Sequence, residues 1–213
     1  MTRHSRQLAL HLPTWGGLRS GAGRKPKGDK PLVSHAARPK LDPRIPVHVV
    51  LRVVAGLPSL RGRAPFAEVK SAFAAGAERL GIRLTHFAVL GNHIHLLVEA
   101  ENERALSRGI QGLVVRIAKG VNRALRRSGR VFSDHYFAYQ LRTPSEVRRA
   151  VRYVVHNHAL HEERAGRPVP PGYRDPFSSA APTAPVVSPR TWLLRIGWRR
   201  ARAGPHWEDR IPL

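Results

Sequence analysis

The chain has 213 residues and a formal net charge of +23, because 37 Lys and Arg residues outnumber 14 Asp and Glu residues. This surplus predicts a polyanionic partner, with nucleic acid the first candidate and an anionic membrane surface the second. Cysteine is absent, which excludes disulfides, thiolate catalysis and Cys-based zinc sites. No apolar stretch approaches the roughly 20 residues of a membrane-spanning helix, so we expect a cytoplasmic, nucleoid-associated protein with no membrane partner.

Composition divides the chain into three regions. Residues 1–44 are rich in Gly, Pro, Arg and Lys and lack periodic apolar residues, so we expect a flexible basic arm. Residues 45–165 contain the periodic apolar patterns of a folded domain. Residues 166–213 are rich in Pro, Gly and Ser and predict a tail, within which the apolar segment Thr191–Trp198 is expected to dock on the core.

The first half of the predicted domain alternates strands with a helix. A β-branched strand begins at Val47, and apolar residues then recur at helical spacing from Phe66 to Leu80, where Gly81 stops the helix. Residues 82–90 predict a second strand. A Gly-Asn turn then leads into a third strand, which begins at His93.

The second half adds two helices and one strand. Asn102 can cap a long basic helix, and the aromatic, alternating residues 131–141 predict a fourth strand. Thr143 and Glu146 form a capping box at the start of the last helix. The order of elements predicts an α+β fold, a ferredoxin-like (RRM-like) antiparallel sheet with helices on one face and an additional C-terminal helix.

His93 and His95 are the first candidates for chemistry. Because strand side chains alternate, both imidazoles share one face, while Ile94, Leu96 and Val98 share the other face and can be buried. Neighbouring imidazoles on a stiff element suit a divalent metal ion.

The last helix carries further polar residues that could accompany this histidine pair. Tyr153 and Asn157 lie one turn apart, and His161 continues their stripe. The Asn157 oxygen could be a third metal ligand, which suits Mg²⁺ or Mn²⁺, although two imidazoles also suit Zn²⁺. A metal ion can polarise a phosphodiester, and the Tyr153 hydroxyl can attack its phosphorus to form a phosphotyrosine.

Basic side chains in two places are candidates for DNA binding, because they can contact the phosphate backbone. Those on the long helix are Arg104, Arg108, Arg116, Lys119 and Arg123, and those in the arm are Arg24, Lys25 and Lys27. The arm around them resembles the basic hooks that enter A·T-rich minor grooves, or it adds non-specific affinity as an unstructured tail.

Two motifs resemble those of a known family. His93-Ile94-His95 matches the HUH motif, and the run from Gly91 to Leu97 resembles its surroundings in the IS200-like HUH single-strand tyrosine transposases. The run from Tyr153 to Asn157 resembles the nucleophile helix of that family, although His158 stands where relatives usually have proline. Within that family the chain looks most like the REP-associated tyrosine transposases, and the resemblance covers roughly residues 44–162.

The resemblance implies a DNA strand transferase that cleaves and rejoins single-stranded hairpin DNA through a 5′-phosphotyrosine. It implies Mg²⁺ or Mn²⁺ as cofactor, with His93, His95 and Asn157 as ligands and Tyr153 as the nucleophile. We expect a monomer or a homodimer.

Several alternatives remain open. A domesticated relative would bind structured repeats without cleaving them, and a zinc hydrolase would need a carboxylate base, for which Glu99 lies on the correct strand face but further along. Tyr136 and Tyr139 are rival nucleophiles. His48 and His86 are expected to be structural or solvated, unless the strand order brings one of them beside the histidine pair.

Overall fold

The structure is a computed structural model that describes residues 40–201. The basic residues Arg24, Lys25 and Lys27, which the sequence predicts to bind DNA, lie outside the described residues. None of the helices described between residues 40 and 201 is long and apolar enough to cross a membrane.

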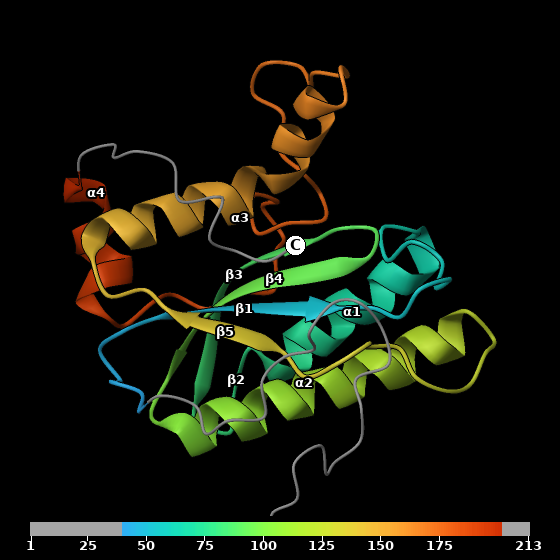
Figure 1. Cartoon of the computed structure of the whole chain (residues 1–213), viewed down its shortest axis with the longest axis horizontal. Helices are drawn as coiled ribbons and strands as arrows, with labels where there is room; N and C mark the ends of the chain where they lie inside the picture. Colours follow the sequence, from blue (N-terminus) through green and yellow to red (C-terminus); the bar gives the residue numbers. More distant parts are fainter. Residues whose placement is uncertain (1–39, 202–213) are drawn as a thin grey trace, which may run out of the picture. The chain divides into compact units, whose positions relative to one another are not determined.

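A five-stranded antiparallel sheet forms the centre of the fold, with the strand order β2-β3-β4-β1-β5. The strands are β1 (Val47–Arg52), β2 (Glu78–Arg79), β3 (Ile82–Val89), β4 (His93–Ala100) and β5 (Phe137–Gln140). Without the two-residue strand β2, the order is that of the ferredoxin-like sheet. The predicted α+β fold is therefore confirmed (Figure 1).

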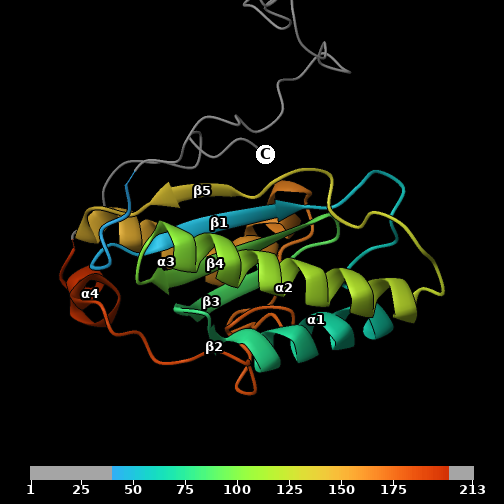
Figure 2. The same ribbon diagram turned by 90° about the horizontal axis from the view of Figure 1, so that it is seen from below.

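Three long helices cover the two faces of this sheet. Helices α1 (Arg63–Gly76) and α2 (Glu103–Ala124) lie on one face, and α3 (Pro144–Arg164) lies on the other (Figures 1 and 2). Gly166, with φ +72°, follows the end of α3, so His158 does not stop the helix.

The alternation of β4 explains why the two faces differ. Ile94, Leu96 and Val98 are fully buried in the core that the sheet forms with α1 and α2. Leu97 belongs instead to a second cluster, which contains Val147, Ala150, Val151 and Val154 of α3. His93 and His95 share the face of Leu97 and therefore lie on the α3 side of the sheet.

Two predicted boundaries are wrong. The strand expected over residues 131–141 is limited to β5, Phe137–Gln140, and α1 ends at Gly76 and does not continue to Leu80. A Cβ atom at Gly76 would lie 2.5 Å from the Leu113 side chain, which shows how closely α2 passes this end of α1. The chain then forms β2 and turns through Leu80 and Gly81, with φ values of +57° and +76°. Tertiary packing therefore overrides the helical periodicity here.

The Pro-rich segment after α3 packs along the outer edge of β3. The backbone N–H of Val89 donates to the carbonyl of Phe177 at 2.8 Å, and that of Val187 donates to Leu84 at 2.9 Å. These bonds cover a strand edge that would otherwise be open to pairing. The short helices η1 (Leu193–Gly197) and α4 (Trp198–Arg200) follow, and Leu193 and Leu194 are buried in the α3 cluster.

Candidate active site

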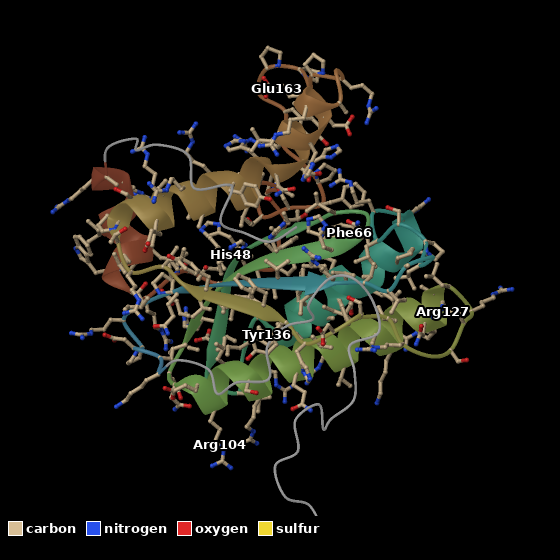
Figure 3. The ribbon with its side chains drawn as sticks, viewed as in Figure 1. His48, Phe66, Arg104, Arg127, Tyr136 and Glu163 are labelled. Carbon is tan, nitrogen blue, oxygen red and sulfur yellow. The ribbon has the colours of Figure 1, made fainter. Side chains whose placement is uncertain are left out.

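Two strands and one helix bring four histidines, a tyrosine and an asparagine together between the sheet and α3. Strand β1 pairs with β4, so that Val50 lies opposite His95. His48, two residues earlier on the same face of β1, places its Nε2 atom 3.1 Å from Nδ1 of His95. Both rings are fully buried, and Figure 3 shows His48 on the side of the sheet that faces α3.

The two histidines of β4 lie side by side. The ring centroids of His93 and His95 are 4.8 Å apart and their planes are nearly perpendicular. Nδ1 of His93 lies 2.7 Å from Oδ1 of Asn92, in the turn before the strand. Because a carbonyl oxygen only accepts hydrogen bonds, His93 donates through Nδ1, and its Nε2 atom retains a lone pair.

Helix α3 places its polar stripe against this pair. A complete capping box at Thr143 and Glu146 fixes where the helix begins. The Tyr153 ring centroid lies 5.2 Å from that of His95, and the His161 centroid lies 6.4 Å from that of His93. Asn157 is fully buried one turn from each of these residues, so the stripe predicted from the sequence faces the histidine pair.

Several buried polar atoms in this site have no hydrogen-bond partner among the described residues. They are Nε2 of His93, Nε2 of His95, Nε2 of His161, and both amide atoms of Asn157. Buried polar atoms are normally paired, and a concentration of orphaned atoms indicates a missing ion, water or ligand. This donor set fits a divalent cation.

The side chains near the histidine pair limit which groups could join it around a metal ion. Within residues 40–201, no group of three His, Asp or Glu side chains is arranged to hold a metal ion. Asn157 is fully buried, and its amide oxygen has no hydrogen-bond partner among the described residues, so it is available as an oxygen donor in this site. Glu99, the carboxylate that a zinc hydrolase would need, is 4% exposed and accepts hydrogen bonds from the backbone of Arg190 and Thr191.

Burial keeps the histidines of the site neutral. Burial lowers the pKa of His48 to about 4. Burial, with smaller effects of His161 and Arg52, also lowers the pKa of His93 to about 4. Burial and the adjacent His48 hold the pKa of His95 well below its usual range. Neutral imidazoles are the form that binds a metal ion.

A pocket of about 600 Å³ opens beside the histidine pair, large enough for a phosphate with part of a nucleotide. Its polar lining consists of Arg52, Asn92, His93, His95, Ser133 and His161. Tyr153 is 6% exposed and is not part of the lining. The pocket therefore gives access to the imidazoles, while the phenol lies behind them under α3.

The basic residues of α2 lie away from this site, because α2 covers the opposite face of the sheet. Arg104, Arg108, Lys119 and Arg123 are exposed there, and Arg123 pairs with Glu68 at 2.7 Å. Figure 3 shows Arg104 pointing away from the sheet. Arg116, also on α2, donates to the carbonyl of Gly112 one turn earlier.

The rival tyrosines have other surroundings. Tyr136 is partly buried against the core on the α1 and α2 side of the sheet. Tyr139 is 40% exposed, and its hydroxyl donates to Glu146 at 3.2 Å. Of these three tyrosines, Tyr153 is the one whose ring packs on His95.

Two residues of the site have no motif in the sequence that would identify them. His48 and Arg52 join the site because of the register of β1 against β4. The sequence gives only a conditional signal for His48, which depends on which strand becomes the neighbour of β4.

The chain was compared with known families and structures. Residues 44–157 match the model of a family described as transposase IS200 like. A structure of a REP-associated tyrosine transposase bound to a REP hairpin has a TM-score of 0.52 and 13% identity, and the match covers 68% of this chain and 82% of that chain. A crystal structure from Deinococcus radiodurans R1, of a protein proposed to be a transposase, has a TM-score of 0.39 and 14% identity. That match covers 64% of this chain and 98% of that chain. No curated protein matches the chain.

Proposed function

Because the chain belongs to the IS200-like transposase family, we propose that it is a DNA strand transferase that cleaves and rejoins single-stranded hairpin DNA through a 5′-phosphotyrosine at Tyr153. The observation that supports this most directly is the packing of the Tyr153 ring on His95, 5.2 Å between centroids, beside buried polar atoms that have no protein partner. The proposed nucleophile and the side chains proposed to bind a metal ion therefore lie in one buried space.

His93, His95 and Asn157 would hold the metal ion through Nε2, Nε2 and Oδ1. Two neutral imidazoles and one neutral amide leave coordination positions for phosphate oxygens, and Mg²⁺ or Mn²⁺ suits such a mixed site. When bound, the ion would polarise the phosphodiester and neutralise the charge that develops on it.

The Tyr153 hydroxyl oxygen would attack the phosphorus atom. The bond from phosphorus to Oη of Tyr153 forms while the bond from phosphorus to the 3′-oxygen breaks, so the DNA stays attached through its 5′-phosphate. The phenol gives up its proton and the departing 3′-oxygen gains one, which leaves a free 3′-OH. Attack by a 3′-OH on the phosphotyrosine reverses the step without ATP, because the phosphoester is retained.

The chain's own residues would also position the DNA. The phosphate would enter through the pocket beside His93 and His95, where Arg52 supplies a positive charge. Because Tyr153 is buried, attack requires α3 to shift relative to the sheet. The exposed basic residues of α2 would contact DNA on the other face, away from the cleaved phosphate.

The test uses hairpin DNA taken from the sequence that flanks the gene, labelled at its 3′ end, with the full chain and Mn²⁺. A 5′-phosphotyrosine predicts that the 3′ label migrates with the protein on a denaturing gel. Tyr153→Phe should abolish this band and retain binding measured by fluorescence anisotropy. Tyr139→Phe, which removes an exposed hydroxyl, is the matched control and should retain the band.

Chelation separates the proposed enzyme from a non-catalytic binder of structured repeats. EDTA should remove the covalent band and leave hairpin binding in place. Binding without a covalent band at any Mg²⁺ or Mn²⁺ concentration would favour the domesticated binder. A band that persists in Tyr153→Phe would reassign the nucleophile to another tyrosine.

A further inference from the structure

We propose that His48 is a positioning residue that fixes the tautomer and orientation of His95, so that His95 presents an unprotonated Nε2 atom to the metal ion. This inference rests on the proposed function of the site. It concerns a histidine that belongs to neither recognisable motif and lies on a different strand, 47 positions before His95.

The contact between the two histidines is short and rigidly held. Nε2 of His48 lies 3.1 Å from Nδ1 of His95, and the rings stack with centroids 5.2 Å apart. Both side chains are fully buried, and they stand on paired strands whose backbone hydrogen bonds fix their separation. Neither ring can turn without disturbing the packing of Tyr153, whose ring lies against both.

The hydrogen bond allows two arrangements of protons, with different consequences. If His95 donates through Nδ1 to His48, then Nε2 of His95 carries a lone pair and can bind a metal ion. If His48 donates instead, the proton of the neutral His95 lies on Nε2. That atom could then not be a metal ligand. The first arrangement is the one that gives the Nε2 atom a function.

The other histidine of the pair shows the same pattern with a different partner. Nδ1 of His93 lies 2.7 Å from the Asn92 side-chain oxygen, and Nε2 of His93 is likewise buried without a hydrogen-bond partner. Both imidazoles are therefore held at Nδ1 while Nε2 is left for another group. Histidines that bind metal ions typically have their second nitrogen held in this way.

The decisive comparison is between two substitutions of His48. In His48→Gln the amide oxygen can reach about the position of Nε2 and still accept from His95. In His48→Asn the side chain is one bond shorter, and its oxygen lies near the position of Nδ1. We expect His48→Asn to weaken Mn²⁺ binding by about 10- to 100-fold, while His48→Gln stays within about threefold of the unmodified chain. His86→Asn, which removes a partly buried histidine on β3, should leave Mn²⁺ binding unchanged.

Mn²⁺ binding is measured by electron paramagnetic resonance titration of the metal-free full chain. Equal Mn²⁺ affinity in His48→Asn and the unmodified chain would overturn the inference. If the unmodified chain binds no Mn²⁺, or if His93→Ala leaves its Mn²⁺ binding unchanged, the proposed function fails instead. Failure of this inference and failure of the proposed function are therefore distinguishable.

A second measurement needs neither metal nor DNA. Nitrogen-15 NMR of histidine-labelled protein reports which ring nitrogen carries the proton, and His95→Gln identifies the His95 signals. We expect the proton of His95 on Nδ1 in the unmodified chain and in His48→Gln. A proton on Nε2 in the unmodified chain would overturn the inference even if His48→Asn fails to fold.

Discussion

Replacing Glu99 by glutamine should loosen the C-terminal segment that supports α3. Glu99 stands on the same face of β4 as the histidine pair and is 4% exposed. Its two oxygens accept from the backbone N–H of Arg190 at 3.0 and 2.9 Å, and one of them accepts from Thr191 at 2.7 Å. Three residues further along, Leu194 is buried in the α3 cluster. This carboxylate therefore anchors the segment just before it reaches the helix.

The size of the effect follows from these contacts. In Glu99→Gln one oxygen becomes an NH₂ group. This group cannot accept a hydrogen bond from the backbone N–H of Arg190, so two donors face each other. Hydrogen bonds to charged groups contribute about 1.5–3 kcal/mol each, so we expect local opening of the segment to become easier by about 2–3 kcal/mol. That difference raises the open population by about 30- to 150-fold. Burial of Leu193 and Leu194, at about 1.5–3 kcal/mol each, keeps the closed form dominant.

Native-state hydrogen exchange measures this opening directly. The amides of Arg190 and Thr191 should lose protection in Glu99→Gln, while amides in the centre of β4 should change far less. Glu101→Gln, which removes an exposed carboxylate two residues away, is the matched control. If the amides of Arg190 and Thr191 are equally protected from exchange in Glu99→Gln and Glu101→Gln, Glu99 does not anchor the segment and the reasoning is wrong.

Three further predictions concern binding, stability and pH. Arg104→Glu combined with Arg108→Glu should weaken hairpin binding about tenfold without lowering the covalent yield at saturating DNA; a lower yield would place α2 near the cleaved phosphate. Tyr153→Ala should reduce the free energy of unfolding in urea by about 3–5 kcal/mol, and Tyr153→Phe by less than about 1 kcal/mol; equal losses would contradict the ring packing. Burial lowers the pKa of His86 from 6.5 to about 4, so the unfolded chain gains a proton first and stability falls as the pH drops through this range. Between pH 7.5 and 5 the free energy of unfolding should therefore fall by about 2 kcal/mol less in His86→Gln than in the unmodified chain. If the two proteins show the same pH dependence, His86 does not cause this loss of stability.

The sequence predicted those features that local patterns determine. Alternation in β4 placed His93 and His95 opposite the apolar residues, and the capping box at Thr143 marked the start of α3. Helical spacing likewise placed Tyr153 and Asn157 on one stripe. The ferredoxin-like order of strands follows from the order of the elements, because short connections and sheet pairing leave few other topologies.

What the sequence could not predict depends on contacts between distant segments. His48 joins the site through the register of β1 against β4, and nothing in its neighbourhood of valines and leucines indicates that. Glu99 is paired with backbone atoms 91 and 92 residues later, in a Pro-rich segment with no strand pattern. The sequence shows that α2 is basic, but it does not show on which face of the sheet this helix packs. The sequence therefore could not place α2 on the face away from the histidines.

The packing of α3 indicates how the buried Tyr153, the proposed nucleophile, could become accessible. From Val147 to Val154 the helix is fixed by a continuous set of buried residues against the sheet. After Asn157 the residues are half-buried or exposed, and only Leu160 packs against that cluster. Local opening requires least free energy where few apolar contacts are lost, so the end of α3 that carries His161 should leave the sheet before the end that carries Val147. His161 lines the pocket, and Tyr153 lies about two turns earlier on the helix, between the buried Val151 and Val154. Lifting the His161 end would therefore uncover the pocket side of Tyr153, where a phosphate would enter, while the valine contacts keep that part of the helix on the sheet.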